Sequence, residues 1–236
     1  MMIDYYSPTA EFYDLLGGQH WAHSDPALAS VLADVDTGHG PVLDLGAGTG
    51  RATELIARTL PEARILAVEP SPGMRAALTS RAVRDEDLRE RVTVVAARAQ
   101  DVELPERLSA AVICGVLGYL DRAERADLWR RITERLPTGA PIVVELMAVS
   151  EPQTVAPVRI ARQRLGDQEY EAWMSGKPCG VEQMRWSATW RVLRGGETVR
   201  EVDVTHDWYT FGLDDLAAET GLTAKQVTPE LGVLIG

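Results

Sequence analysis

The stretch P-V-L-D-L-G-A-G-T-G at Pro41–Gly50 decides the fold of this 236-residue chain. The apolar residues on either side of Asp44 form a short run of the kind found in buried parallel strands. Asp44 itself lies inside that run, where an unpaired carboxylate is costly to bury. Three glycines then alternate with small residues, and a helical pattern follows over residues 51–60. Such a turn lets a ligand approach the backbone without meeting a Cβ atom, although an ordinary tight turn would share the pattern.

A second apolar run, residues 65–68, ends at Glu69. An acidic residue at this place binds the ribose hydroxyls in nucleotide-binding βαβ units. Two classes of cofactor use this geometry, and the glycine spacing separates them. The dinucleotide fingerprint G-x-G-x-x-G requires glycine at position 51, where this chain has Arg51. The spacing therefore argues against a nicotinamide dehydrogenase.

The string D-L-G-x-G-x-G at Asp44–Gly50 resembles the first motif of the class I S-adenosylmethionine-dependent methyltransferases of small-molecule type. V-E-P-S at Val68–Ser71 resembles the second motif of that family. The resemblance implies an α/β fold, a Rossmann-like, seven-stranded, mostly parallel sheet with helices on both faces. It also implies S-adenosylmethionine as the cofactor and S-adenosylhomocysteine as the product.

The composition favours a globular enzyme that acts on small molecules. Apolar residues make up 45% of the chain and charged residues 25%, with a net charge of −11. This charge repels phosphate backbones, so no nucleic-acid partner is expected, and the arginines of 122–135 are interpreted as the solvated face of a helix. No signal peptide or apolar run of membrane-spanning length is present, so a cytoplasmic protein without a membrane partner is expected. The two cysteines offer no metal-ligand spacing, and no metal is expected.

The chain is predicted to be a single methyltransferase domain, 1–236. Residues 1–40 would form an N-terminal helical lid, with a helix that starts at Ser24-Asp25-Pro26, and residues 41–149 the cofactor-binding half. Residues 150–209 would be a substrate-covering insertion. It contains an antiparallel hairpin, residues 184–192 and 198–208, that turns at Gly195-Gly196. Residues 210–236 would supply the closing helix and strands.

The family resemblance assigns the cofactor site residue by residue. Glu69 would bind the ribose hydroxyls, and Asp44 would serve the methionine amino end through the turn backbone or water. Gln100 is the candidate for adenine because Arg98 replaces the acid often found there, whereas Met74 is either an adenine contact or a core residue. Strand four lacks the usual acid, since Ala110 and Ala111 stand in its place. The full cofactor-binding set is Asp44, Gly46, Ala47, Gly48, Glu69, Pro70, Met74, Ala99, Gln100, Cys114 and Gly115.

Three residues are candidates for catalysis. Tyr13 belongs to A-E-F-Y-D at Ala10–Asp14, which resembles a lid helix of small-molecule methyltransferases, and it would lie near the methyl group or merely pack. Glu145 is expected at the end of the fifth strand, facing the ligand crevice of open α/β sheets, to contact substrate or pair with an arginine. His206 lies on an apolar hairpin face and is a general base, a substrate donor or a satisfied core histidine.

The predicted function is methyl transfer to an O, N or C atom of a small molecule, an intermediate of natural-product or general metabolism. A methyltransferase-fold enzyme that catalyses a cyclisation or rearrangement, or a non-catalytic binding module, is the alternative. A homodimer is left open.

Overall fold

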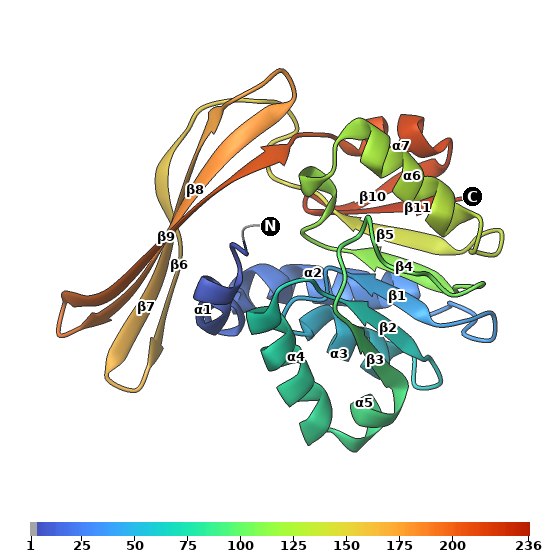
Figure 1. The fold of residues 1–236 in the computed structure, drawn as a ribbon, viewed down its shortest axis with the longest axis horizontal. Coiled ribbons are helices and arrows are strands. Elements are labelled where there is room, and N and C mark those ends of the chain that lie inside the picture. The colour runs from blue at the N-terminus through green and yellow to red at the C-terminus, as the bar shows by residue number, and fades with distance from the viewer. Residues whose placement is uncertain (1–3) are drawn as a thin grey trace.

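The computed structural model describes residues 4–236, and two sheets organise them (Figure 1). Sheet A has seven strands in the order β10-β11-β5-β4-β1-β2-β3. Its parallel part runs through β1 to β5, and β11 is antiparallel to both of its neighbours. The strands are β1 Val42–Leu45, β2 Ile65–Val68, β3 Val92–Val95, β4 Ala110–Ile113, β5 Pro141–Glu145, β10 Thr223–Thr228 and β11 Leu231–Ile235. The predicted fold class, a mostly parallel seven-stranded sheet with an added antiparallel unit, is confirmed.

The strand order places the reversal point between β1 and β4, which are direct neighbours. Ligands of open α/β sheets bind in the crevice at the carboxyl ends of such strands. Both strands are fully buried along their length, because helices cover both faces of the sheet. The helices of this part are α3 Arg51–Thr59, α4 Pro72–Arg84, α5 Glu86–Arg91, α6 Arg122–Thr133 and α7 Leu213–Thr220.

The N-terminal segment is helical, as the sequence suggested, but its long helix starts earlier than expected. After the 3-10 turn η1 Ser7–Thr9 come α1 Ala10–Leu16 and α2 Gly18–Leu32. Pro26 therefore lies inside α2 instead of starting it. The predicted start was wrong because tertiary packing outweighs the local signal: Leu28 and Leu32 are buried in the core beneath sheet A.

Sheet B is formed by four long antiparallel strands in the order β6-β7-β8-β9. They are β6 Val155–Leu165, β7 Gln168–Pro178, β8 Gln183–Arg194 and β9 Glu197–Tyr209. The sequence predicted the β8–β9 hairpin with its turn at Gly195-Gly196, and both are present. The β6–β7 hairpin was not predicted, because prolines interrupt it. Pro157 is tolerated because β6 is an edge strand, and Pro178 ends β7.

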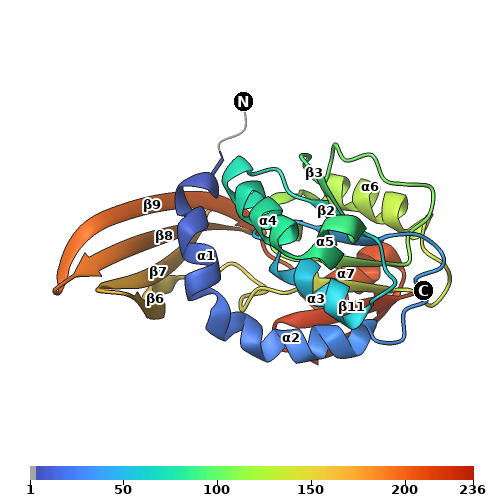
Figure 2. The same cartoon turned by 90° about the horizontal axis from the view of Figure 1, so that it is seen from below.

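One face of sheet B is apolar and the other is polar, and α1 packs on the apolar face. Alternate residues of β8 from Met184 to Val192 are buried, and the residues between them lie on the opposite, more exposed face. Figures 1 and 2 show α1 between sheet B and α4, so that this short helix joins the two sheets. The opposite face of sheet B carries cross-strand polar pairs such as Arg185–Asp207 and Thr189–Asp203.

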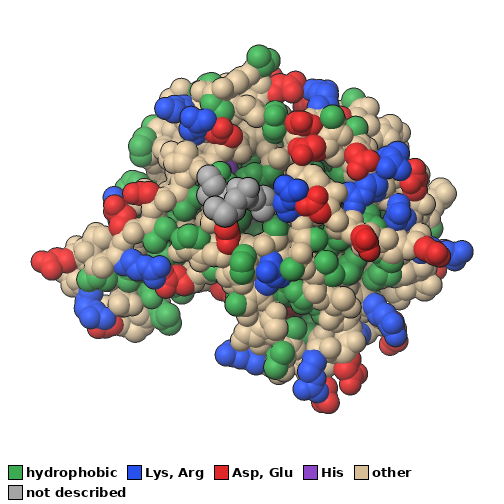
Figure 3. Space-filling view, viewed as in Figure 1, with side chains coloured by type: hydrophobic (Ala, Val, Ile, Leu, Met, Phe, Trp, Pro, Cys, Tyr) green, Lys and Arg blue, Asp and Glu red, His purple; other side chains and the backbone are tan. Residues whose placement is uncertain are grey.

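Charged side chains of both signs are interspersed over the face drawn in Figure 3. The charge pairs on α6 follow the helical spacing that the sequence indicated, for example Arg130 with Asp127 and Glu134. No helix within residues 4–236 has both the length and the apolar character needed to cross a membrane.

Candidate active site

The glycine turn lies where β1 ends against β2 and β4. The N–H groups of Gly46 and Ala47 both donate to the carbonyl of Val68, at 2.9 and 3.0 Å. Gly46 has φ +79°, and a Cβ there would lie 2.6 Å from the Cys114 carbonyl, so this glycine makes room for the end of β4. Gly48 has φ +56°, and a Cβ there would meet nothing nearer than 3.9 Å. The open approach predicted for the turn therefore lies at Gly48.

Glu69 folds back onto this turn from the end of β2. Its carboxylate accepts from the N–H of Gly48 at 2.9 Å and from the N–H of Ser71 at 2.7 Å. The side chain is buried, and burial raises the pKa of the carboxyl above its usual value although both hydrogen bonds lower it. Each carboxylate oxygen keeps a second lone pair, so Glu69 retains acceptor capacity for two hydroxyl groups. Arg75 supports the same loop by donating to the carbonyls of Glu69 and Pro70.

Asp44 lies beneath the turn and has no exposed surface. One carboxyl oxygen accepts from Thr53 Oγ1 at 2.5 Å, and the other has no hydrogen-bond partner among the described residues. Burial raises the pKa of Asp44 to about 7. Asp44 therefore has no surface open to solvent, and a nearby positive charge would favour its charged form.

The residues assigned to adenine lie in two places. Met74 is in the first turn of α4, and Ala99 and Gln100 are in the loop after β3. Met74 and Ala99 are both buried. Gln100 donates from its amide nitrogen to Glu124 at 3.2 Å, which leaves its carbonyl oxygen as the end able to accept. Arg131, a residue that sequence reasoning had placed on a solvated face, donates to the carbonyls of Ala99 and Gln100 and thereby fixes this loop.

At the end of β4, Cys114 and Gly115 face the end of β5. Cys114 is a free, buried thiol whose pKa is raised well above its usual value by burial, so it behaves as a small apolar residue. Gly115 has φ +64°, and a Cβ there would meet only Glu145 Oε2, at 3.8 Å. Gly115 and Glu145 thus lie close together at the carboxyl ends of β4 and β5, which is the arrangement that the strand order predicts.

Tyr13 projects from α1 into an aromatic cluster rather than toward solvent. Its ring lies 5.4 Å from Trp190 of sheet B and 5.8 Å from Tyr6, centroid to centroid. Burial, followed by Tyr119 and Glu69, raises the pKa of the Tyr13 phenol, so it stays protonated at neutral pH.

His206 lies at the other side of the same cluster. Its ring centroid is 5.6 Å from Tyr119 and 6.1 Å from Tyr5. Burial lowers the pKa of His206, and the neighbouring Asp207 only partly opposes this, so the imidazole is neutral at pH 7 and able to accept a proton. The structure thus connects Tyr13 and His206 through Tyr6 and Tyr119 in one aromatic cluster.

Two residues that the sequence did not single out complete this cluster. The hydroxyls of Tyr6 and Tyr119 are 2.6 Å apart, although 113 residues separate them in the chain. Tyr119 belongs to the 3-10 turn η2 Leu117–Tyr119, and its ring is 4.9 Å from Trp208. The preceding Gly118 allows this approach, since a Cβ there would lie 1.8 Å from the Trp208 ring. In the sequence, only the Gly118-Tyr119 pair after β4 could have indicated that Tyr119 packs closely against another ring.

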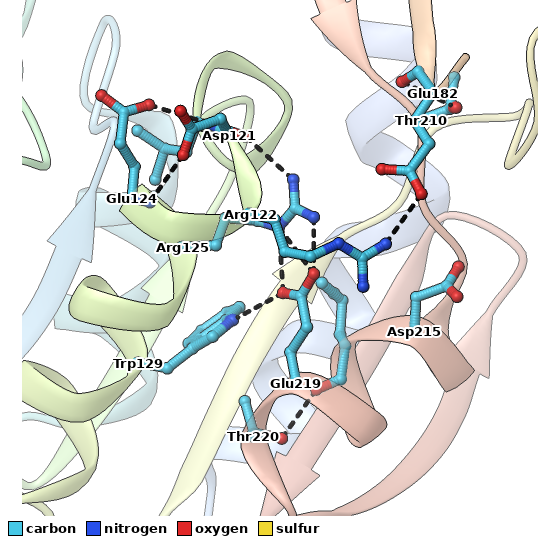
Figure 4. A network of polar contacts seen from close by, with 12 residues as sticks. Asp121, Arg122, Glu124, Arg125, Trp129, Glu182, Thr210, Asp215, Glu219 and Thr220 are labelled. Carbon is cyan, nitrogen blue, oxygen red and sulfur yellow. Dashed lines mark hydrogen bonds and ion pairs between the residues drawn. The ribbon is translucent and has the colours of Figure 1, made fainter.

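A buried ion pair holds the loop that carries Tyr119 (Figure 4). Arg125 of α6 pairs with Glu219 of α7 at 2.6 Å, and Trp129 also donates to that carboxylate. Another guanidinium nitrogen of Arg125 donates to the carbonyl of Leu120, directly after η2. The expectation that the arginines of this helix lie outside was wrong for Arg125, which is 2% exposed, because Glu219 neutralises it from a segment 94 residues away.

Comparison with known proteins links this site to methyl transfer. Residues 42–139 match the family described as "Methyltransferase domain". A trans-aconitate 2-methyltransferase from Methylobacterium nodulans is 31% identical over 166 residues, which cover 61% of this chain and 59% of that protein. The chain thus matches about three fifths of the length of this curated relative. The family match over residues 42–139 includes the glycine turn and Glu69, and it agrees with the resemblance of the two motifs to methyltransferases.

Three solved structures, two of them described as methyltransferases, share most or all of the fold. Streptomyces venezuelae DesVI gives a TM-score of 0.74 at 19% identity and covers 100% of this chain and 99% of that one. CalS10 from Micromonospora echinaspora, an amino pentose methyltransferase of calicheamicin biosynthesis with S-adenosylmethionine bound, gives 0.71 at 16%, covering 100% and 98%. The sugar N-methyltransferase KedS8 from Streptoalloteichus gives 0.66 at 20%, covering 92% and 88%. At these identities the likeness establishes the fold, sheet B included.

Proposed function

We propose that this chain, which matches a methyltransferase domain over residues 42–139, transfers the methyl group of S-adenosylmethionine to a small-molecule acceptor. The observation that supports this most directly is the glycine turn held by Glu69 at the reversal point of the sheet. Three carboxyl groups, those of Asp44, Glu69 and Glu145, belong to the ends of β1, β2 and β5 at this edge. An acidic crevice suits a cofactor that carries a sulfonium and an ammonium group.

The residues present fit this cofactor. Gly48 and Gly115 leave open space where any side chain would project, and the carboxylate of Glu69 can accept from two ribose hydroxyls. One buried oxygen of Asp44 has no hydrogen-bond partner within residues 4–236, and a nearby cation would stabilise its charge. S-adenosylmethionine, when bound, supplies an electrophilic methyl group. The protein's own task is then to position the acceptor and to exclude water.

We assign the acceptor side to the aromatic cluster of Tyr13, Tyr119 and His206, with Glu145 at the crevice border. An amine acceptor fits this side best. Aromatic faces and a carboxylate attract an ammonium group, and the neutral imidazole of His206 can take the proton that the amine must lose before it attacks. The solved relatives KedS8 and CalS10 are described as sugar N- and amino pentose methyltransferases, which supports an amino-sugar or similar natural-product intermediate. A cytoplasmic location and a homodimer remain predictions.

Calorimetric titration with S-adenosylhomocysteine tests the cofactor assignment. The intact chain is expected to bind in the micromolar range. Glu69→Ala should weaken binding by about a hundredfold, because the ribose acceptor is lost and the N–H groups of Gly48 and Ser71 lose their partner. Glu62→Ala, an exposed carboxylate just before β2, is the matched control and should leave the affinity unchanged. No binding by the intact chain would refute the assignment.

Mass spectrometry of products tests the reaction. Amino sugars offered with S-adenosylmethionine should gain one methyl group, about 14 daltons, and His206→Asn should slow that step without changing S-adenosylhomocysteine affinity. A product of unchanged mass would favour the cyclisation or rearrangement alternative. Methylation of trans-aconitate in place of amines would overturn the amine assignment but not the methyltransferase function.

A further inference from the structure

We infer that Asp14 is a positioning residue that couples the cofactor-binding turn to the acceptor side of the site, an inference that rests on the proposed function. Its carboxylate accepts from Thr49 Oγ1 at 2.5 Å and from Arg81 Nη2 at 2.7 Å. Thr49 is part of the glycine turn, whereas Asp14 follows Tyr13 on α1. A single side chain therefore connects the turn to the helix that forms part of the acceptor wall.

Helix α1 depends on its docking contacts. It has seven residues, and an isolated helix of that length is not stable in water. Its apolar side packs on sheet B, where Phe12 is fully buried with its ring 5.5 Å from Trp190. The ion pair of Glu11 with Arg200 of β9 adds a second tie to that sheet. Asp14 connects α1 to the glycine turn by its hydrogen bond with Thr49, and to α4 by its ion pair with Arg81.

The guanidinium of Arg81 holds Asp14, Glu54 and Thr49 together. Besides Asp14, its guanidinium donates to Glu54 Oε2 at 2.5 Å and to the carbonyl of Thr49 at 3.1 Å. Both polar groups of Thr49, the hydroxyl and the carbonyl, are thus engaged by the pair Asp14–Arg81. Gly50 has φ +88°, and the absence of a Cβ there lets Leu78 of α4 approach, which keeps Arg81 close to the turn.

The coupling follows from these contacts. A ligand that orders the glycine turn fixes Thr49, which favours the docked position of Asp14 and hence of Tyr13. Linkage makes the effect reciprocal, so a docked α1 strengthens ligand binding at the turn by the same factor. Because Asp14 is half exposed, solvent weakens its ion pair, and the factor is modest. The cofactor therefore prepares the acceptor wall, which predicts that cofactor binds before acceptor.

Hydrogen exchange with S-adenosylhomocysteine as the probe tests this coupling without an acceptor. In the intact chain the ligand should slow exchange in residues 44–50 and also in residues 10–16. In Asp14→Ala it should still protect residues 44–50, but the added protection of residues 10–16 should fall by at least half. Calorimetry should show affinity weakened by about fivefold, the lower end of typical coupling between sites.

Two further variants separate coupling from general damage. Thr49→Val removes the donor from the other side with little change of shape, and it should uncouple residues 10–16 in the same way. Glu11→Gln removes a carboxylate from the same helix without touching the turn, and it should retain the protection of residues 10–16. Ligand binding with full protection of residues 10–16 in both Asp14→Ala and Thr49→Val would overturn the inference alone. No binding by the intact chain would overturn the proposed function and this inference with it.

Discussion

At the scale of single residues, burial raises the pKa of two carboxyl groups in the site, those of Asp44 and Glu69. Asp44 is the extreme case, since it has no exposed surface and one of its oxygens has no partner among the described residues. In a protein that only had to fold, an apolar residue would be the better choice at that place. The retention of a carboxyl group beneath the glycine turn is accounted for by the charge of the proposed cofactor.

Asp44 therefore makes stability depend on pH in a defined direction. Its pKa is about 7 in the folded chain and 3.8 when unfolded, so between these values the folded state binds more protons. The free energy of unfolding then falls as pH rises through that window, by on the order of 4 kcal/mol for three pKa units. Asp44→Asn should remove this contribution, which denaturant unfolding between pH 4 and 7.5 would detect.

The matched control is Glu106→Gln, a change at an exposed carboxylate outside the site. It should retain the slope of the intact chain, since an exposed group is not desolvated by folding. An unchanged slope in Asp44→Asn would mean that Asp44 is charged in the folded chain and that its environment is more polar than its burial indicates.

At the scale of elements, the sequence predicted those parts that local chemistry decides. The glycine turn, the two acidic strand ends at Glu69 and Glu145, and the β8–β9 hairpin all follow from short patterns, and the structure contains each of them. The β6–β7 hairpin was missed because its prolines read as breakers, although an edge strand tolerates them. Whether an arginine on α6 faces solvent depends on a partner far along the chain, which no local pattern reveals.

The sequence also did not predict the contact between Tyr6 and Tyr119, because these residues are far apart in the chain. One hydroxyl comes from the N-terminal segment and the other from η2, and only the docking of α1 between the sheets brings them together. The sequence identified Tyr13, Glu145 and His206 as candidates because it predicted the helix or strand that carries each of them. The assembly of Tyr13 and His206 into one aromatic cluster was not predictable, since it depends on how sheet B packs against η2.

The Arg125–Glu219 pair gives a prediction at the scale of packed helices. Glu219→Leu leaves the guanidinium of Arg125 buried without a counter-charge, so the free energy of unfolding should fall by about 3–5 kcal/mol. The double variant Arg125→Met/Glu219→Leu should recover most of that loss, because two apolar residues replace two buried charges. Urea unfolding of the three proteins measures both values.

An exposed pair provides the comparison. Asp207→Asn breaks the ion pair with Arg185 on the outer face of sheet B, and it should change stability by less than about 1 kcal/mol. If Glu219→Leu were no more damaging than Asp207→Asn, the α6–α7 pair would not be holding the Tyr119 loop.

At the scale of the whole molecule, the chain divides its tasks between two sheets. Sheet A brings the glycine turn, Glu69 and Glu145 to one edge. Sheet B, with α1 and η2, supplies the aromatic cluster above that edge. The apolar cluster around Phe12 and Trp190 lies between sheet B and α1, whereas Met184, Trp186 and Trp208 of sheet B pack against Val149 and Tyr119, which follow β5 and β4. Cofactor binding and acceptor binding are therefore expected to be separable.

A deletion tests this division, because the chain leaves sheet A and returns to it at nearly the same point. A Cβ on Gly212 would lie 3.8 Å from the Cβ of Ser150. Replacing residues 152–209 with a short Gly-Ser linker, together with Phe12→Ser and Leu16→Ser to cover the exposed helix face, should leave sheet A folded. The product should bind S-adenosylhomocysteine with affinity within about tenfold of the intact chain, yet methylate no amine.

Calorimetry gives the affinity, and circular dichroism with urea unfolding shows whether one cooperative transition remains. A deletion protein that folds but binds no S-adenosylhomocysteine would mean that sheet B shapes the cofactor site itself. A second control, Phe12→Ser and Leu16→Ser in the full-length chain, separates the loss of α1 docking from the loss of the sheet. If that protein keeps its affinity and loses only amine turnover, the acceptor wall alone depends on α1. If it also loses affinity by about fivefold, the coupling through Asp14 accounts for the difference, because an undocked α1 no longer holds Thr49.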